Sequence, residues 1–525
     1  MVNRWFSNIV GWLAVVVCLS MGRAEEVQIQ ILHTTDIHSH IALPPNTDAA
    51  SKNSSGAMLQ LGSLISVQRE NFGKERTLLI DTGDTLQGTL VASLSKGQAG
   101  VQALLSMGYD VWVPGNHEFD FGIEHFFQLS EPLRPITLCG NLHPLKVEPY
   151  PAWKMFELGG ARVAVIGATA SYMRHWFIGE IESVCSVEMA AAMLERIMPD
   201  ILAAKPDMIV LAIHQGILMG LDVRNVNEIY AIGRKFPEID LILGGHTHLE
   251  FAGRKIGNRS WYVQPGAGAK CFAIVTATID TEKHETVQIE SFLRYSNLEG
   301  TPYYPPMYEV VAPWLAEEEQ KGAEEICPPR RFAVTTEGTP GVSCQMSELI
   351  AKAIAEAVGA DCALHGTLSA KILEADVPIS FRDIYEVIPY ENEIVEAWVT
   401  SEELAEIALE QWNQNSSYSY SGLYGAMLDV FVAGKGAKKT AVVAGFGEQC
   451  APPEEGRRYK LALNSFTAAG SGRYPVLRRI MDDPESKMKK TGLAVREVVA
   501  DYLKTHPDED IRPVRWIRVK KERKE

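Results

Sequence analysis

The stretch VQIQILHTTDIH, residues 27–38, decides the fold expected for the first half of the chain. Its first part, Val27–Leu32, is rich in β-branched and other apolar side chains, as is typical of a buried strand. The polar residues Asp36 and His38 follow directly, so the predicted strand ends where chemically versatile side chains begin. Similar apolar runs are found further along the chain at Thr77–Ile80, Val111–Val113, Arg162–Ile166, Met208–Ile213 and Ile239–Leu243.

Stretches with helical spacing lie between these apolar runs. Gln98–Met107 and Ser186–Ala204 are the clearest of them. Strands that alternate with helices predict a layered α/β domain. The alternating pattern of Gly268–Ile279 predicts a β edge to the same domain, which we place at residues 25–297.

The composition changes after residue 297. Residues 298–330 form a predicted linker, in which a proline-rich segment around Pro302 and Pro306 precedes a charged helical stretch, Val310–Glu325. Residues 331–525 then form a second predicted domain of the α+β class. Its clearest elements are a helix at Met346–Val358, a strand at Ile394–Val399, and a helix at Ser401–Trp412 with Thr400 as N-cap.

The first 24 residues have the pattern of a signal peptide. Arg4 precedes a short apolar run, Ile9–Leu19, and Ala24 ends a small-residue cleavage site. The run is shorter than the roughly 20 residues that a membrane-spanning helix needs, although an uncleaved single-helix anchor is an alternative. We therefore expect an exported protein, periplasmic or extracellular, with no membrane span in the mature chain.

Composition and charge exclude several classes of protein. With 46% hydrophobic and 22% charged residues the chain is globular. A net charge of −16 does not suit binding to a nucleic acid polymer, which needs a basic surface. Removal of the signal peptide leaves seven cysteines, an odd number; Cys344 and Cys362 flank one predicted helix and could pair, whereas buried free thiols are the alternative.

Five short motifs of the first domain follow predicted strands. Loops at the carboxyl ends of strands are where open α/β sheets place their sites. Carboxylate groups, imidazole rings and a neutral amide oxygen together suit zinc, manganese or cobalt, so the set predicts two adjacent divalent metal ions. The motifs are Asp36-Ile37-His38, Gly83-Asp84, Gly115-Asn116-His117-Glu118, His214 and Gly244-Gly245-His246-Thr247-His248.

With these motifs the chain resembles the calcineurin-like metallophosphoesterases. The resemblance is to their two-domain branch, the secreted 5′-nucleotidases with their UDP-sugar hydrolase and 2′,3′-cyclic-nucleotide phosphodiesterase relatives. It implies a four-layer-type α/β metallophosphoesterase domain, followed by a linker helix and an α+β substrate-binding domain. It also implies that Asp36, His38 and His248 bind one metal ion, that Asn116, His214 and His246 bind the other, and that Asp84 bridges the two.

The resemblance assigns the chemistry to a histidine and a carboxylate beside the metals. His117 would face the substrate and Asp120 would orient it, with a third ligand as the alternative for His117. Two neighbouring cations activate water and neutralise a phosphoryl group during attack. Glu118 is then expected to act as a structural hydrogen-bond acceptor rather than as a base.

The second domain matches the family pattern in part. Tyr390 and Phe466 would stack on a base and Asn392 would support it, but the family's phosphate-binding arginine and ribose-binding aspartate are replaced by Ser369 and Gly472. A nucleoside monophosphate is the substrate expected first. The alternatives are a 2′,3′-cyclic nucleotide, a sugar phosphate or UDP-sugar, and a binding protein that keeps the metals for stability.

Overall fold

The computed structural model describes most of the chain. It describes residues 26–43, 56–173, 177, 181–218, 222, 227–296, 300–338, 343–414, 422–433, 438–447, 449–470 and 474–521. The predicted signal peptide and Gly472 lie outside the described residues. Among those that are described, no helix is both long and apolar enough to cross a membrane.

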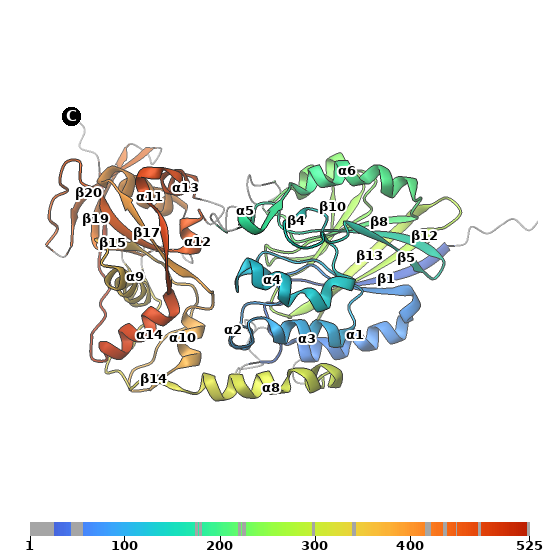
Figure 1. Ribbon diagram of the computed structural model, residues 1–525, viewed down its shortest axis with the longest axis horizontal. Coiled ribbons are helices and arrows are strands. Elements are labelled where there is room, and N and C mark those ends of the chain that lie inside the picture. Colours follow the sequence, from blue (N-terminus) through green and yellow to red (C-terminus); the bar gives the residue numbers. More distant parts are fainter. Residues whose placement is uncertain are drawn as a thin grey trace, which may run out of the picture.

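Two mixed sheets form the centre of the N-terminal lobe (Figure 1). The first has the strand order β13-β12-β1-β2-β3 and the second β10-β11-β9-β8-β6-β5. The first sheet consists of β1 (Glu26–Thr34), β2 (Thr77–Asp81), β3 (Val111–Trp112), β12 (Cys271–Asp280) and β13 (Glu285–Tyr295). The second consists of β5 (Trp153–Leu158), β6 (Ala161–Ala168), β8 (Met208–Ile213), β9 (Leu241–Leu243), β10 (Glu250–Ile256) and β11 (Ser260–Pro265).

The sheets pack face to face and helices cover both outer faces. Ile29 and Ile31 of β1 meet Val165 of β6 and Val210 of β8 in a fully buried core between the sheets. The result is the predicted four-layer α/β arrangement (Figure 1). The helices on the first sheet are α1 (Met58–Phe72), α2 (Leu90–Ser95), α3 (Gln98–Met107) and α4 (Ile123–Leu129), and those on the second are α6 (Ala190–Ala203) and α7 (Ile229–Lys235). Shorter elements are β4 (Leu142–Pro144), α5 (Ile181–Val184) and β7 (Cys185–Val187).

All six apolar runs predicted as strands are strands, but two neighbouring predictions were wrong in detail. The strand at Gly268–Ile279 is not an edge, because β13 returns as a hairpin and pairs with β12 along its whole length. The helix expected from Ser186 begins only at Ala190, since Cys185–Val187 pairs with β4 as a short strand.

The linker helix, α8 (Pro305–Gly322), starts five residues before the predicted helix. Pro305 and Pro306 occupy its first turn, where proline is tolerated because the first backbone N–H groups have no partner within the helix. Its N-terminal part packs against the N-terminal lobe, where Trp314 Nε1 donates a 3.0 Å hydrogen bond to Gln102 Oε1. Figure 1 shows α8 running beneath the N-terminal lobe toward the second lobe.

The C-terminal lobe is built on a five-stranded sheet of order β18-β15-β21-β17-β22. Thr400 caps α11 as predicted: Glu403 N donates to Thr400 Oγ1 at 3.2 Å. Cys344 and Cys362 are both free and buried, and Cys344 instead caps α9 with its sulfur atom. The strands are β14 (Glu325–Cys327), β15 (Cys362–Leu364), β16 (Ile379–Ser380), β17 (Glu393–Val399), β18 (Leu423–Tyr424), β19 (Ala426–Ala433), β20 (Lys438–Phe446), β21 (Tyr459–Asn464), β22 (Lys489–Ala494) and β23 (Ile517–Lys521). The helices are α9 (Gln345–Val358), α10 (Phe381–Val387), α11 (Ser401–Gln414), α12 (Ser465–Ala468), α13 (Pro475–Asp482) and α14 (Val495–Thr505).

The packing of α4 gives a stability prediction. Phe126 is fully buried and its ring centroid lies 4.1 Å from that of Phe119. We expect Phe126→Ala to lower the free energy of unfolding by about 3–5 kcal/mol, because a large buried ring leaves a cavity. Urea unfolding measures this change. Phe292→Ala is the control, since Phe292 is 54% exposed on β13, and an equal loss for both variants would contradict the prediction.

Candidate metal centre

The five sequence motifs meet at one end of the two sheets. Each follows the carboxyl end of its strand: β1, β2, β3, β8 and β9. Potential ligand atoms gather there in two groups within the described residues. The first group is Asp36, His38, Asp84 and His248, and the second is Asp84, His214 and His246, so Asp84 is common to both.

Several of these residues have a left-handed backbone conformation, which residues other than glycine rarely adopt. The φ angles of Asp36, His38, Asp84, His246 and His248 are all positive, between 49° and 72°. Left-handed conformations at residues other than glycine are uncommon, and they tend to occur at functional sites. The tight loops after the strands turn these side chains toward one point.

The first group surrounds a small space with nitrogen and oxygen atoms. His38 Nε2 lies 3.0 Å from His248 Nε2, and His248 Nε2 lies 3.4 Å from Asp36 Oδ1. His38 Nε2 is 4.0 Å from Asp84 Oδ2. His248 is the most exposed of the four, with 47% of its side chain accessible, and therefore marks the open side of the site.

In the second group the same oxygen atom of Asp84 is used again. Asp84 Oδ2 lies 3.0 Å from His214 Nε2, and the rings of His214 and His246 are 5.3 Å apart. The other oxygen, Oδ1, accepts a 2.8 Å hydrogen bond from the backbone N–H of His117. One carboxylate oxygen is thereby oriented by the main chain, while the other faces both groups of imidazoles.

Hydrogen bonds on the far side of the rings fix which nitrogen atoms face inward. His38 Nδ1 bonds to the carbonyl oxygen of Gln87 at 3.1 Å, and His214 Nδ1 bonds to that of Thr82 at 2.6 Å. A carbonyl oxygen only accepts, so in each ring Nδ1 is the donor. Nε2 then points toward the centre and can bind a metal ion in place of a proton, which is the usual arrangement of a metal-binding histidine.

Two buried polar atoms test whether cations fit this site. Among the described residues, Asn116 Oδ1 and His214 Nε2 have no well-directed hydrogen bond; the latter has only its ion-pair contact with Asp84. An unsatisfied buried polar atom costs about 1–3 kcal/mol, so such atoms need an explanation. A divalent cation beside Asn116 and His214 would satisfy both, and these residues therefore fit a metal ion.

The pKa values of the histidines are consistent with metal binding at this site. Burial lowers the pKa of His38 to about 3, with nearby His248 adding to the effect, and burial likewise lowers that of His246 to about 3. For His214 burial also acts to lower the pKa, but the Asp84 carboxylate outweighs it and raises the pKa to about 9. Neutral His38 and His246 offer lone pairs, and the carboxylate near His214 attracts positive charge.

Glu118 has the structural role expected from the sequence. Its fully buried carboxylate accepts four backbone N–H groups, two on each oxygen atom. The donors are Asp84 and Gly115 to Oε2, at 2.8 and 2.6 Å, and Thr85 and Leu86 to Oε1, at 2.7 and 3.0 Å. One side chain thus joins the loop after β2 to the loop after β3.

His117 lies beside the metal groups and is paired with a carboxylate. Its Nδ1 is 2.7 Å from Asp120 Oδ2. Burial acts to lower the pKa of His117, but Asp120 and then Asp84 overcome this effect and raise it to about 10. The ring lies 5.3 Å from that of His38 on one side and 6.0 Å from that of Tyr390 on the other.

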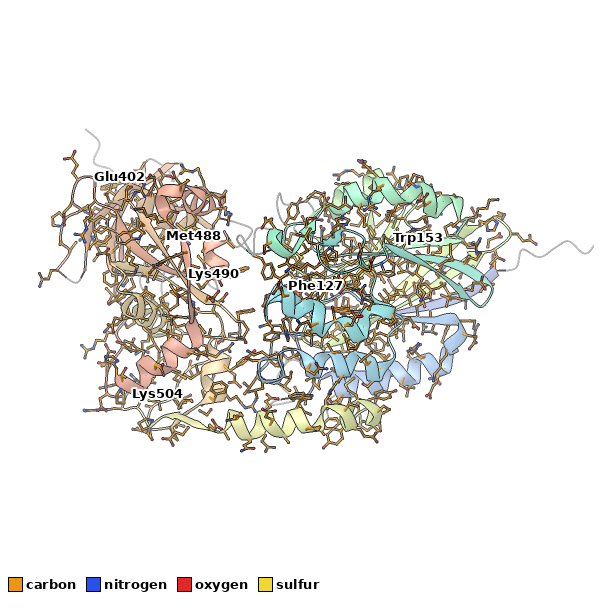
Figure 2. The ribbon with its side chains drawn as sticks, viewed as in Figure 1. Phe127, Trp153, Glu402, Met488, Lys490 and Lys504 are labelled. Atoms are coloured by element: carbon orange, nitrogen blue, oxygen red, sulfur yellow. The ribbon has the colours of Figure 1, made fainter. Side chains whose placement is uncertain are left out.

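The predicted substrate-binding residues lie in the C-terminal lobe. Tyr390 stacks on His117 across the two lobes, with 27° between the ring planes. Asn392 Oδ1 accepts a 3.3 Å hydrogen bond from Ser465 Oγ, next to Phe466, which is 43% exposed on α12. Ser369 bonds locally to Lys371 N. In Figure 2, Lys490 of β22 and Phe127 of α4 lie on the facing sides of the two lobes.

Sequence reasoning missed Gln87. This fully buried residue holds His38 through its backbone carbonyl, while its side chain donates a 3.3 Å hydrogen bond to Pro389 O in the other lobe. Any residue type can bond through its main-chain carbonyl, so the sequence does not indicate this contact. The one indication in the sequence is the neighbouring Gly88, because a Cβ atom there would lie 2.5 Å from His38 Cβ.

Comparison with known families agrees with this architecture. Residues 29–250 match the family model described as calcineurin-like phosphoesterase, and residues 326–479 match that of the 5′-nucleotidase C-terminal domain. The first match contains every candidate metal ligand, and the second contains Tyr390, Asn392 and Phe466. The chain therefore contains a calcineurin-like phosphoesterase domain followed by a 5′-nucleotidase C-terminal domain.

Individual relatives show the extent of the likeness. Protein UshA of Yersinia enterocolitica is 22% identical over 91% of both chains. The 5′-nucleotidase of Rattus norvegicus is 26% identical over 43% of this chain and 38% of that protein. A crystal structure of a 5′-nucleotidase precursor from Thermus thermophilus has a TM-score of 0.71 at 20% identity, covering 94% of this chain and 99% of that one. The match to a probable 5′-nucleotidase of Treponema pallidum covers 41% of that protein, so it spans less than half of the relative's length.

The four hydrogen bonds of Glu118 give a prediction for the metal centre. Glu118→Gln replaces one acceptor oxygen by an NH₂ group, which faces two N–H donors and leaves them unsatisfied. We expect stability to fall by about 2–4 kcal/mol, with weaker metal binding, since Asp84 is no longer held in place. Urea unfolding and metal titration measure the two effects. Glu124→Gln on α4 is the control, because Glu124 is exposed and forms a surface ion pair with Lys146; a similar loss there would contradict the assignment.

Proposed function

We propose that this protein is an exported phosphoesterase with two divalent metal ions that hydrolyses nucleoside monophosphates to nucleoside and phosphate. The observation that carries the proposal is the pair of ligand groups that share Asp84 directly beside the His117–Asp120 pair. A calcineurin-like phosphoesterase domain supports phosphate-ester hydrolysis as the reaction. Export rests on the leader pattern of residues 1–24.

The metal ligands in this proposal are the seven predicted residues. The list is Asp36, His38 and His248 for one ion, Asn116, His214 and His246 for the other, and Asp84 for both. When bound, zinc, manganese or cobalt ions there would neutralise phosphoryl charge and lower the pKa of water. The phosphate group would enter from the open side of the site, near the exposed His248.

His117 acts on the substrate rather than on a metal ion. Because Nδ1 is bonded to Asp120, the other nitrogen atom is the one available to the substrate. In this position it would stabilise the charge of the phosphoryl group and donate a proton to the leaving oxygen. Asp120 keeps the ring in one orientation, as a carboxylate commonly does for a catalytic histidine.

A nucleotide is the favoured substrate because of the C-terminal domain. Tyr390 and Phe466 supply aromatic rings on which a base can stack, and Asn392 lies between them in the sequence and supplies an amide. The rat relative bears the name 5′-nucleotidase. One observation favours a second candidate: Ser369 stands where the family has a phosphate-binding arginine, so a 2′,3′-cyclic nucleotide or a UDP-sugar is the alternative substrate.

Phosphate release tests this function directly. We expect the purified chain to release phosphate from AMP, to lose this activity on chelation, and to regain it when manganese, cobalt or zinc is restored. The panel should include UDP-glucose, 2′,3′-cyclic AMP, a sugar phosphate and bis-(p-nitrophenyl) phosphate. Turnover of the other esters but not of AMP would reject the nucleoside monophosphate, and no turnover with any metal would reject the enzyme.

A variant of His117 tests its role. We expect His117→Ala to lower kcat by about 10²–10⁴-fold while the bound metal content stays unchanged, because a general acid is lost and no ligand is removed. Steady-state kinetics and elemental analysis provide the two values. His125→Ala is the control, since His125 lies on α4 and its Nε2 bonds to the backbone oxygen of Lys96, away from the candidate ligands. Loss of metal from the His117 variant would make His117 a ligand instead.

A further inference from the structure

The segment Ile388–Glu391, here called the Tyr390 loop, carries the ring that reaches across to the metal centre. Three consecutive carbonyl oxygens of this loop are bound by side chains rather than by neighbouring backbone. The middle one, Pro389 O, accepts from Gln87 Nε2 and from the Tyr385 hydroxyl, both at 3.3 Å. The other two are bound by one residue, Arg496.

Arg496 lies in the first turn of α14, about a hundred residues further along the chain. Its Nε donates a 2.9 Å hydrogen bond to Ile388 O, and its Nη2 donates one of 3.2 Å to Tyr390 O. The two bonds bracket Pro389. Since both come from one planar guanidinium group, they fix the orientation of the peptide groups before and after the loop's centre.

The positive charge of Arg496 interacts with Glu391 of this loop and with the nearby Tyr385 ring. Both carboxylate oxygens of Glu391 lie within 3.3 Å of its Nη1. The guanidinium carbon lies 4.1 Å from the centre of the Tyr385 ring. With only 8% of Arg496 exposed, its removal would leave Glu391 and two carbonyl groups without their partner in a largely buried place.

The same loop is bonded to the N-terminal lobe once directly, through Pro389, and once indirectly, through Arg496. Arg496 Nη1 reaches Ser93 Oγ of α2 at 3.5 Å, and Gln87 donates to Pro389 O. Gln87 also accepts from His38, a candidate metal ligand, through its backbone oxygen. Gln87 therefore bonds to the Tyr390 loop through its side chain and to His38 through its backbone oxygen, and neither of these bonds involves Arg496.

We propose that Arg496 is a positioning residue: it fixes the Tyr390 loop so that the Tyr390 ring faces His117, and so sets the distance at which an aromatic group of the substrate sits from the phosphoryl site. The inference rests on the proposed function for its substrate and on the hydrogen bonds of Arg496 for its geometry. It assigns specificity to a residue that does not itself touch the substrate. The substrate class it favours is a phosphate ester with an aromatic base, over esters without one.

The test compares two substrates in Arg496→Met, which keeps the length of the side chain but removes its donors and charge. With AMP we expect KM to rise by about 10- to 100-fold, the range for losing hydrogen bonds to a charged group. With glycerol phosphate, which has no ring to stack, kcat/KM should change by less than about threefold. Arg496→Lys should restore only part of the KM, because an ammonium group can pair with Glu391 but cannot bracket the loop.

Arg458→Met is the matched control. Arg458 also bonds to one carbonyl, Trp398 O at 3.1 Å, and to one carboxylate, Glu403 at 3.0 Å, in the same lobe but away from the Tyr390 loop. We expect its KM values to stay within about twofold of the wild type, as for a partly exposed ion pair.

An equal loss of kcat/KM with AMP and with glycerol phosphate in Arg496→Met would overturn the proposal, since a general loss of folding lowers the activity on both substrates.

Hydrogen exchange separates this proposal from the proposed function. The amides of residues 390–393 should exchange at least about tenfold faster in Arg496→Met than in the wild type, because the loop loses its anchors. This result is independent of turnover. Unchanged exchange would overturn the positioning role even in an active enzyme, whereas faster exchange in a chain that hydrolyses no nucleotide would support positioning and reject the nucleotide as substrate.

Discussion

The metal centre depends on one buried carboxylate, that of Glu118. Its four hydrogen bonds join two loops that leave different strands, and so they determine where Asp84 stands relative to Asn116. Burial, followed by the nearby Asp84, raises the pKa of Glu118, and the amide donors oppose that rise. The carboxylate is thus stabilised by main-chain N–H groups together with the nearby His214, and its hydrogen bonds connect the geometry of the site to the backbone.

Much of the fold and the position of the site could be predicted from sequence, because local patterns determine both. Apolar runs specify the strands, and the topology then brings the ends of five strands together without further information. The roles of the seven ligand residues and of His117 remain predictions, although the residues lie where those roles require. The start of α8 was missed because the proline-rich segment indicates a connector as readily as a first helical turn. Arg496 could not be found, since it acts on backbone carbonyls about a hundred positions away.

The choice of residues in the site satisfies two constraints at once. Five candidate ligands have a left-handed backbone, and all of them are Asp or His. Among residues other than glycine, Asp, Asn and His tolerate that conformation best, and they also carry the oxygen and nitrogen atoms that bind divalent ions. Glutamate or cysteine could bind a cation in principle, but neither would suit the tight loops after β1, β2 and β9. The backbone conformation thereby restricts which residue types can serve as metal ligands at these positions.

The linker helix α8 has a mechanical consequence. Its buried residues Met307 and Val311 belong to the core of the N-terminal lobe, so most of its length moves with that lobe. Its far end meets the other lobe through the ion pair of Glu318 with Arg382 at 2.7 Å. The helix is therefore held by both lobes, through its buried residues on one side and through this ion pair on the other. Any change in backbone angles at its end, around Gly322, would shift the whole C-terminal lobe, and with it Tyr390, relative to the metal centre.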